Sequence, residues 1–276
     1  MHDRRCAVAF FALLLTAPAP FDREPPQLRI LVTNDDGINA PALHALCREL
    51  ATIAEVTVCA PDSNRSGVSH SVTMGQTMQV SEREIDGATR AVAVSGTPAD
   101  AVAFGVLTLA GEHAFDLVVS GINNGANVGD VSHYSGTVGA AMEAVYRGVP
   151  AIAVSQAPGA GTAATAAFTR RFAEEMFEHP AIPGVVWSIN APRRVQGPPV
   201  VAPMGGSYLQ VTSYRKLSEE GEVEVWRSMV GSGPKGPDGC DTAEHLAGRM
   251  TVTPLRFDWT DQRAREAAAG WDLGGG

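Results

Sequence analysis

The sequence predicts an α/β protein with a Rossmann-like, mostly parallel sheet, helices on both faces and a β-rich C-terminal extension. Three observations lead to this prediction. Through residues 28–190, short β-branched runs alternate with helical patterns, and this order gives parallel strands joined by helical crossovers. The strand runs are almost continuously apolar, as in a sheet that is covered on both faces. Through residues 191–276, glycine and proline are frequent and the β-like runs are short and irregular.

The first predicted unit is a strand, an acidic loop and a helix. The apolar run Ile30-Leu31-Val32 is typical of a buried strand, and Asn34-Asp35-Asp36-Gly37 ends it. An Asp-Gly pair between two strands is typical of a hairpin turn. Here a helix follows instead, because the apolar residues of 43–50 fall at helical spacing after Asn39 as a cap and Pro41 in the first turn. The two carboxylates therefore lie where open α/β sheets bind ligands.

The later elements follow the same alternation. Further strands are predicted at residues 55–60, 116–120, 149–155 and 185–190, and helices at residues 97–109, 135–148 and 162–178. Two alternating stretches, at residues 73–80 and 89–94, predict a small β excursion. The C-terminal part has β-like runs at residues 210–213, 222–229 and 249–255. We expect a metal- and phosphate-binding core at residues 28–190 and an extension at residues 191–276 that forms an oligomer contact or covers the site.

The N-terminal residues 1–25 form a separate segment. Arg4 and Arg5 precede the apolar run Cys6 to Leu15, and small residues and prolines follow, which is the order of an export signal. We therefore expect an exported protein, periplasmic or secreted, and a cytoplasmic one if this segment is not a signal. The run is too short for a stable membrane span, and no later stretch is long and apolar enough for one.

Composition limits the partners. With 276 residues and 45% hydrophobic content, the chain can form one large domain with an appendage. A formal net charge of −9 and the lack of a Lys/Arg cluster argue against a nucleic-acid polymer as a partner. The four cysteines show no CxxC spacing, so we expect neither a zinc site nor a disulfide framework.

Short oxygen-bearing side chains follow three of the predicted strands. Asp35 and Asp36 follow the first, Ser66 lies in the loop after the second, and Asn123 and Asn127 follow the third. In a parallel sheet these loops leave the same edge. Carboxylate, hydroxyl and amide oxygens suit a hard divalent cation, Mg²⁺ or Mn²⁺, with water in the remaining positions. The convergence of three loops is stronger evidence than any one of them.

An anion site is predicted beside this cation site. Ser135-Gly136-Thr137 begins a helix, and the N–H groups and the dipole at that end favour a phosphate. Ser135 could equally be only the N-cap of the helix. A hard metal beside such a helix end indicates phosphoryl chemistry. His70 and His133 lie in the same loops and could act as a general acid or contact substrate, although a loop histidine is more often only a solvated polar residue.

Several long motifs carry a family resemblance. They are ILVTNDDGINAP, APDSNRSGVSHSVT, VSGTPADAV, DLVVSGINNGANVGD and YSGTVGAAMEAVYRGVPAIAVS, with weaker matches at SINAP and CDTAEHLAGRMTVTPL. In this order, from Arg29 to about Leu255, they resemble the SurE family of metal-dependent nucleotidases and acid phosphatases. The resemblance implies a Rossmann-like core with a β-rich extension that joins homodimers or homotetramers.

The resemblance also implies the site and the reaction. One divalent cation per subunit would be bound by Asp35, Asp36, Ser66 and Asn123, and phosphate by the loop from Ser135 to Thr137, with Asn127 as a further contact. Asp35 and Asp36 would be the catalytic pair. The implied reaction is hydrolysis of a nucleoside monophosphate, a 5′- or also a 3′-nucleotide, to nucleoside and phosphate. Whether Asp35 activates water or attacks phosphorus is left open by the sequence.

The chain departs from the family in one loop. In the loop that precedes Tyr134, the position that is usually acidic in the family holds Val131, and Asp130 lies one place earlier. We expect this difference to affect the geometry of the loop and the nucleotide preference. Two other functions stay open: a broad acid phosphatase or exopolyphosphatase, and a non-catalytic nucleotide-binding protein. A Rossmann-like cofactor-dependent enzyme is less consistent with the sequence, since no GxGxxG follows the first strand.

Overall fold

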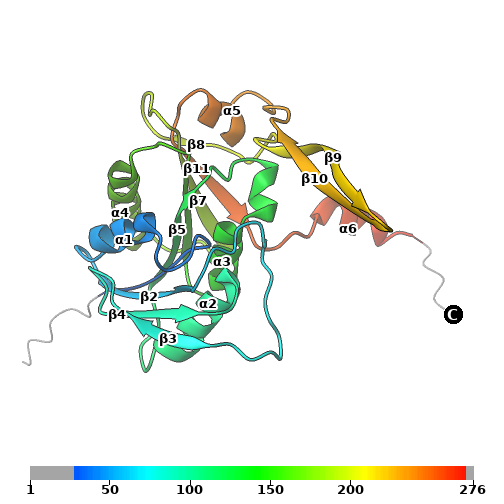
Figure 1. The fold of residues 1–276 in the computed structure, drawn as a ribbon. Helices are drawn as coiled ribbons and strands as arrows, with labels where there is room; N and C mark the ends of the chain where they lie inside the picture. Colours follow the sequence, from blue (N-terminus) through cyan, green and yellow to red (C-terminus); the bar gives the residue numbers. More distant parts are fainter. Residues whose placement is uncertain (1–27, 272–276) are drawn as a thin grey trace, which may run out of the picture.

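The computed structural model describes residues 28–271, so the predicted export segment and Cys6 lie outside the described residues. Within this range the fold is a mixed sheet in the order β3-β4-β2-β1-β5-β6-β7-β11-β8, with helices on both faces (Figure 1). The strands are β1 (Arg29–Thr33), β2 (Glu55–Pro61), β3 (Val80–Arg83), β4 (Arg90–Val94), β5 (Leu117–Asn124), β6 (Ala151–Gln156), β7 (Val185–Ala191), β8 (Val200–Val201) and β11 (Thr251–Arg256). The predicted α/β class is confirmed.

The six strands from β4 to β7 are parallel to their neighbours. β1 pairs with β2 on one side and with β5 on the other. The strands at the margins differ, because β3 pairs antiparallel with β4 and β11 pairs antiparallel with β7. Since β2, β1 and β5 are adjacent, the loops that follow them leave neighbouring positions at the carboxyl edge of the sheet.

Two hydrophobic clusters cover the two faces of the sheet. Ile30 and Val32 of β1 face the cluster that includes α1 and α4, whereas Leu31 faces the cluster that includes α2 and α3. This alternation follows from the two-residue period of a strand. The helical elements are α1 (Pro41–Leu50), α2 (Pro98–Phe104), η1 (Gly105–Leu109), η2 (Asp130–Tyr134), α3 (Gly136–Tyr146), α4 (Thr162–Glu178), α5 (Asp241–Leu246) and α6 (Gln262–Ala268).

The local signals at the helix starts are confirmed in one case and wrong in another. Thr97 caps α2 in a capping box with Asp100, and Pro98 occupies the first turn. At α1 the predicted Pro41 is in place, but the N-cap is Ala40 and no side chain caps the helix, so the prediction of Asn39 as cap is wrong. The carbonyl of Gly37 accepts the Ala40 N–H instead, and this backbone turn leads the chain into α1.

Two strands have other bounds than the sequence predicts. β5 extends to Asn124, because its pairing with β6 resumes at Asn123 after a register shift. The predicted strand at residues 73–80 is almost entirely loop, and β3 begins only at Val80. The first shift places Asn123 on the end of a strand, where its backbone is held by the sheet.

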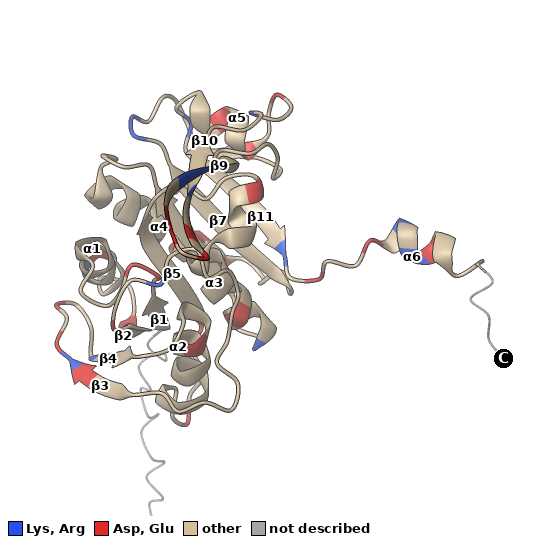
Figure 2. Cartoon of the chain, turned by 45° about the vertical axis from the view of Figure 1, so that its right-hand side comes forward, with Lys and Arg blue, Asp and Glu red and all other residues tan. Residues whose placement is uncertain are grey.

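The C-terminal part contributes strands to the sheet and also leaves it. β8 and β11 join the main sheet, which therefore contains strands from both sides of residue 190. β9 (Gln210–Glu220) and β10 (Val223–Gly231) form a separate antiparallel hairpin that extends from the body (Figure 1). After β11 an extended segment carries α6 away from the body (Figure 2).

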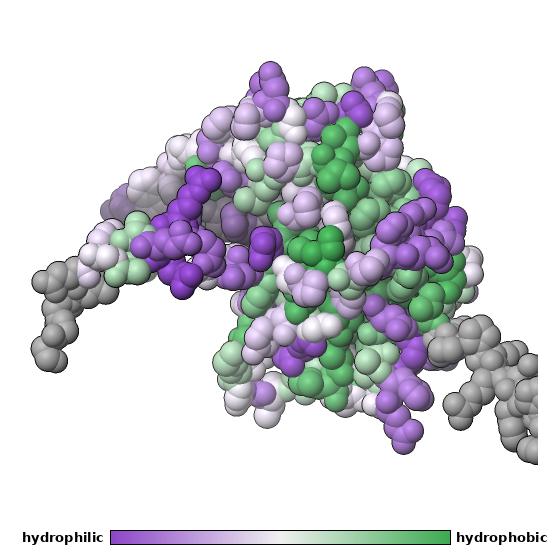
Figure 3. Space-filling model, turned by 180° about the vertical axis from the view of Figure 1, so that it is seen from behind, coloured by the Kyte–Doolittle hydropathy of each residue, from purple (hydrophilic) through white to green (hydrophobic). Residues whose placement is uncertain are grey.

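The surface and the cysteines add two findings. In the view of Figure 2, acidic and basic residues are interspersed along the chain. Seen from behind, hydrophobic residues gather on the main body and hydrophilic ones predominate on the projecting segments (Figure 3).

Cys47 and Cys59 are buried, and burial raises the pKa of each thiol to about 12, so they act as apolar side chains. Among residues 28–271, no helix has the length and hydropathy of a membrane span.

Candidate functional site

Asp35 lies where the exits of β1 and β2 meet the start of α3. Its side chain is 3% exposed, and the Thr137 hydroxyl donates a hydrogen bond of 2.7 Å to Asp35 Oδ1. The Arg65 N–H donates to the Asp35 carbonyl oxygen at 2.7 Å. Gly136 fits between them, because a Cβ atom there would lie 2.9 Å from Asp35 Cβ and 3.3 Å from the Arg65 carbonyl oxygen. Three segments that are distant in sequence thus meet at Asp35.

The electrostatics of Asp35 favour a bound cation. The pKa of this carboxyl is raised to about 6, chiefly by burial; the negative charge of Asp36 adds to the rise, and the hydrogen bond from Thr137 opposes it. A carboxylate in such surroundings lacks the counter-charge that it needs. A positive ion between Asp35 and Asp36 would supply that charge and favour the ionised form of Asp35.

Asp36, which follows β1, is bonded to the loop after β2 and to the end of β5. Its Oδ1 accepts a hydrogen bond of 3.2 Å from Asn64 Nδ2, in the loop after β2. Its Oδ2 accepts a hydrogen bond of 3.1 Å from the N–H of Asn124, at the end of β5. Unlike Asp35, the side chain of Asp36 is half exposed, so it faces the space above the sheet edge.

Ser66 and Asn123 flank the two carboxylates. The Ser66 N–H donates to Asn64 Oδ1 at 3.0 Å, and Asn64 is the residue that also contacts Asp36. Asn123 Nδ2 donates to the Gly125 carbonyl oxygen at 2.7 Å, which leaves the amide oxygen of Asn123 as the atom that could bind a cation. The four predicted metal ligands therefore lie at the carboxyl ends of three adjacent strands, β1, β2 and β5.

The donor set fits a hard cation. Among residues 28–271, no group of three or more His, Cys, Asp and Glu side chains could hold a metal ion. A cation at this edge would thus meet two carboxylates and neutral oxygens, which suits Mg²⁺ or Mn²⁺ better than zinc. Asn34, which the sequence did not single out, adds a buried amide oxygen without a partner among the described residues. The feature of the sequence that could have identified Asn34 is its position in the Asn-Asp-Asp-Gly motif, directly before Asp35.

The start of α3 uses its side chains within the protein. Ser135 Oγ accepts the Val138 N–H at 3.1 Å, so Ser135 is a true N-cap. The hydroxyl of Thr137 is bonded to Asp35, and the Thr137 backbone N–H also lowers the pKa of that carboxyl. The dipole of this eleven-residue helix points its positive end at the Asp35 carboxylate.

Asn127 has a different environment from the other predicted contacts. It is 6% exposed, its Nδ2 donates to Ser155 Oγ at 2.8 Å, and its N–H donates to Asn190 Oδ1 at 2.7 Å. Its carbonyl oxygen accepts the Ser132 hydroxyl at 2.9 Å. Asn127 thus holds the loop after β5 against β6 and β7, while its predicted contact with phosphate stays a prediction.

The loop after β5 is also held by the C-terminal extension. The Gly129 N–H donates to Asp241 Oδ2 and the Gly205 N–H to Asp241 Oδ1, both at 2.9 Å. Gly129 has a φ of 60°, and a Cβ atom there would lie 2.1 Å from the Gly206 carbonyl oxygen. The residues in the loop that departs from the family follow directly: Asp130 is exposed and Val131 is half buried in η2.

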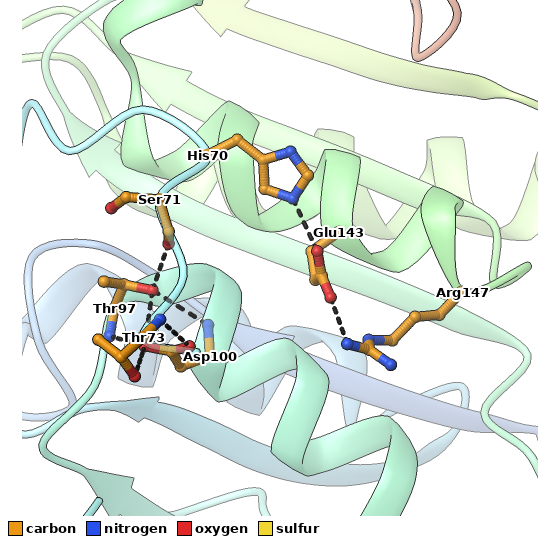
Figure 4. A network of polar contacts seen from close by, with 7 residues as sticks. All are labelled: His70, Ser71, Thr73, Thr97, Asp100, Glu143 and Arg147. Carbon is orange, nitrogen blue, oxygen red and sulfur yellow. Dashed lines mark hydrogen bonds and ion pairs between the residues drawn. The ribbon is translucent and has the colours of Figure 1, made fainter. Parts of the chain in front are cut away.

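The loop after β2 is held in place by polar contacts with α3 and α2 (Figure 4). His70 Nε2 lies 2.7 Å from Glu143 Oε2, and Glu143 Oε1 lies 2.6 Å from an Arg147 nitrogen. Further along, the Thr73 N–H and hydroxyl each donate to Asp100 at 2.9 Å. These contacts fix the long loop that carries Ser66 against α3 and α2.

The fold and the site define a class: α/β proteins with a Rossmann-like sheet and a carboxylate pair at its carboxyl edge, beside the start of a helix. Within that class, this chain belongs to the SurE family, since the family model described as survival protein SurE matches residues 30–210.

Relatives with curated names support the assignment. The chain is 38% identical over 254 residues to a protein of Geobacter sulfurreducens named 5'-nucleotidase SurE, covering 89% of this chain and 94% of that one. It is 37% identical to the protein of the same name from Vibrio parahaemolyticus, covering 88% and 94%. The crystal structure of the SurE protein from Aquifex aeolicus matches with a TM-score of 0.75 and 30% identity, over 87% of this chain and 97% of that one.

The raised pKa of Asp35 predicts how the metal-free protein responds to pH. Because the pKa is about 6 in the folded state against 3.8 as its ordinary value, the folded state holds the proton more tightly, and stability falls as pH rises through 6. In EDTA, the wild type should lose about 2.4 kcal/mol of unfolding free energy between pH 4 and pH 7 relative to Asp35→Asn. Urea unfolding at a series of pH values measures this difference.

The control for this experiment is Asp86→Asn, which changes a carboxylate whose side chain is 81% exposed. This variant should follow the wild-type curve. Parallel curves for the wild type and Asp35→Asn would contradict the assignment of a buried, raised carboxyl to Asp35.

Proposed function

We propose that this protein is a metal-dependent phosphomonoesterase that hydrolyses nucleoside monophosphates to nucleoside and phosphate. The observation that carries the proposal is the position of Asp35, a buried carboxylate at the junction of β1 and the start of α3. Such a carboxylate can hold a cation next to the helix end that attracts a phosphate. The curated relatives named 5'-nucleotidase SurE support a nucleotide as the substrate.

The cation would be one Mg²⁺ or Mn²⁺ per subunit, held by Asp35, Asp36, Ser66 and Asn123. When bound, such an ion supplies polarisation of the phosphate and a lower pKa for a bound water. The protein contributes orientation: Asn64 and Asn124 fix the two Asp36 oxygens, and Thr137 fixes Asp35. These contacts restrict both carboxylates before any ligand binds, which reduces the reorganisation needed on binding.

The phosphate would be bound at the Ser135-Gly136-Thr137 segment. The two hydroxyls there already serve as N-cap and as donor to Asp35, and the Thr137 N–H also interacts with Asp35, so the Gly136 N–H and the helix dipole are the groups left for the anion. Asn127 would act mainly on the shape of the loop that precedes them. A side chain at position 136 would collide with Asp35, which explains the glycine at this point.

Phosphate release tests the proposal directly. The wild type should release phosphate from nucleoside 5′-monophosphates with Mg²⁺ or Mn²⁺ and lose this activity in EDTA. Asp35→Asn should lower kcat/KM by at least about 100-fold, because it removes a charged group next to the reacting phosphate. A 3′-nucleotide, an aryl phosphate and a polyphosphate in the same assay would rank the substrates.

The stereochemistry at phosphorus separates the two roles of Asp35. When a nucleoside phosphorothioate that is chiral at phosphorus through oxygen isotopes is hydrolysed in isotopically labelled water, the thiophosphate product should show inversion if Asp35 activates water. It should show retention if the Asp35 carboxylate attacks phosphorus, because that route takes two displacements. Folded, metal-loaded protein that binds nucleotide but releases no phosphate from any substrate would support a non-catalytic nucleotide-binding protein instead.

We also propose that the β9–β10 hairpin joins subunits of a homodimer or homotetramer. Tyr214 is 67% exposed and Trp226 is 51% exposed on this projecting hairpin, although large aromatic side chains usually find a partner. Changing both to aspartate should lower the particle mass in solution, as measured by light scattering after size-exclusion chromatography. Leu107→Asp, which changes an exposed residue on η1, is the control and should leave the mass unchanged.

Export is proposed from the N-terminal sequence, which lies outside the described residues. The basic pair and the apolar run from Cys6 to Leu15 support this proposal. In cell fractionation, the full-length chain should appear outside the cytoplasm, and a chain that starts at residue 27 should stay inside. Equal retention of both chains would contradict export.

A further inference from the structure

A cavity of about 300 Å³ opens beside the first turns of α3. Val138 and Met142 of α3 form one wall, and Phe257 and Trp259, which follow β11, form the other. The walls are largely apolar, and this volume is at the lower end of the range typical of small-molecule sites. None of the residues proposed to bind the metal lines this cavity.

The cavity is continuous with the proposed phosphate site. Ser135 lines it and is also the N-cap of α3, the helix end that would receive the phosphate. Ser132, three residues before the N-cap Ser135, lines it as well. A phosphate monoester bound at this helix end can therefore place its organic group in the cavity.

Two aromatic side chains, His133 and Trp259, line the cavity. The rings of His133 and Trp259 lie 5.8 Å apart at 89° to each other. Trp259 is 77% exposed, so most of the ring is free to contact another molecule. Flat heterocycles stack on such rings, and the contact depends little on which base is present because every base has a π-face.

His70 offers a fixed polar atom to the same cavity. Its Nε2 is bonded to Glu143, which is 4% exposed and is also paired with Arg147 (Figure 4). Burial raises the pKa of Glu143, but the hydrogen bonds from His70 and Arg147 outweigh this and hold it below the ordinary value. Glu143 accepts the Nε2 proton, which leaves Nδ1 of His70 for a hydrogen bond to another group.

We propose that this cavity is the subsite for the nucleoside part of the substrate, with the base stacking on Trp259 and contacting His133 at its edge, and with His70 Nδ1 forming a hydrogen bond with a nucleoside hydroxyl. The inference rests on the proposed function, because it assumes that the phosphate binds at the start of α3. It makes Trp259 a specificity-determining residue: its contact contributes to nucleotides and is absent for phosphate esters without a base.

The test compares two substrates that share the phosphate and differ in the organic group. For AMP and methyl phosphate, kcat/KM is measured with the full-length, metal-loaded wild type, Trp259→Ala and His133→Ala. The AMP to methyl phosphate ratio should fall about tenfold in each variant, mainly through a higher KM for AMP. Trp259→Tyr, which keeps an aromatic ring, should keep the ratio within about threefold of wild type.

The matched control is Trp271→Ala. Trp271 is 66% exposed after α6 and does not line the cavity, so its removal should leave the ratio unchanged. An unchanged ratio in both Trp259→Ala and His133→Ala would overturn the proposal. The proposal would also be overturned if Trp259→Ala changed the particle mass in light scattering and left the ratio unchanged. That result would mean that a second copy of the chain covers the cavity.

Binding of adenosine alone separates this inference from the proposed function. In saturation-transfer NMR, adenosine should receive a signal from the wild type and a much weaker one from Trp259→Ala. If the wild type hydrolyses neither ester, the proposed function fails, and the adenosine signal still decides on the subsite. If the wild type hydrolyses both esters but adenosine gives equal signals with the two proteins, the subsite fails alone.

Discussion

The hydrogen bond from the Thr137 hydroxyl to Asp35 joins the first strand of the sheet to the start of α3, and the candidate site depends on it. Both groups are almost fully buried, and Gly136 lies so close to Asp35 that no larger residue fits. Removing one partner would leave a polar group buried without compensation, which costs about 1–3 kcal/mol. The same contact points the positive end of a helix at a carboxylate that burial tends to protonate.

This contact can form only because the sheet places β2, β1 and β5 side by side. Asp36 then receives hydrogen bonds from the loops after both neighbouring strands, through Asn64 and Asn124. The loop after β2 lacks regular structure over most of its length, so its position depends on side chains: His70 bonded to Glu143, and Thr73 bonded to Asp100. The proposed metal ligands and the proposed anion site are therefore connected by hydrogen bonds.

The C-terminal part completes this arrangement from a distance in sequence. Asp241 accepts N–H groups from Gly129 and Gly205, so the loop that leads to α3 is held by residues far downstream. Burial raises the pKa of Asp241, although these N–H groups lower it. The segment after β11 also supplies Phe257 and Trp259 to the cavity beside α3. The extension therefore contributes to the sheet edge and also forms the projecting β9–β10 hairpin.

The sequence by itself determined the α/β class, nearly all helices and strands of the core, and the polar residues at the strand exits, because these follow from local periodicity and turn chemistry. It predicted α4 with its observed bounds, yet ended β5 too early and placed a strand at residues 73–80. Those errors arise where pairing with a distant strand, rather than local preference, decides the backbone. Only the tertiary structure decided which distant residues come into contact. Thr137 donates a hydrogen bond to Asp35, Asn127 holds the loop after β5, and Trp259 lines the cavity beside α3. Such contacts join residues distant in sequence, and no local pattern encodes them.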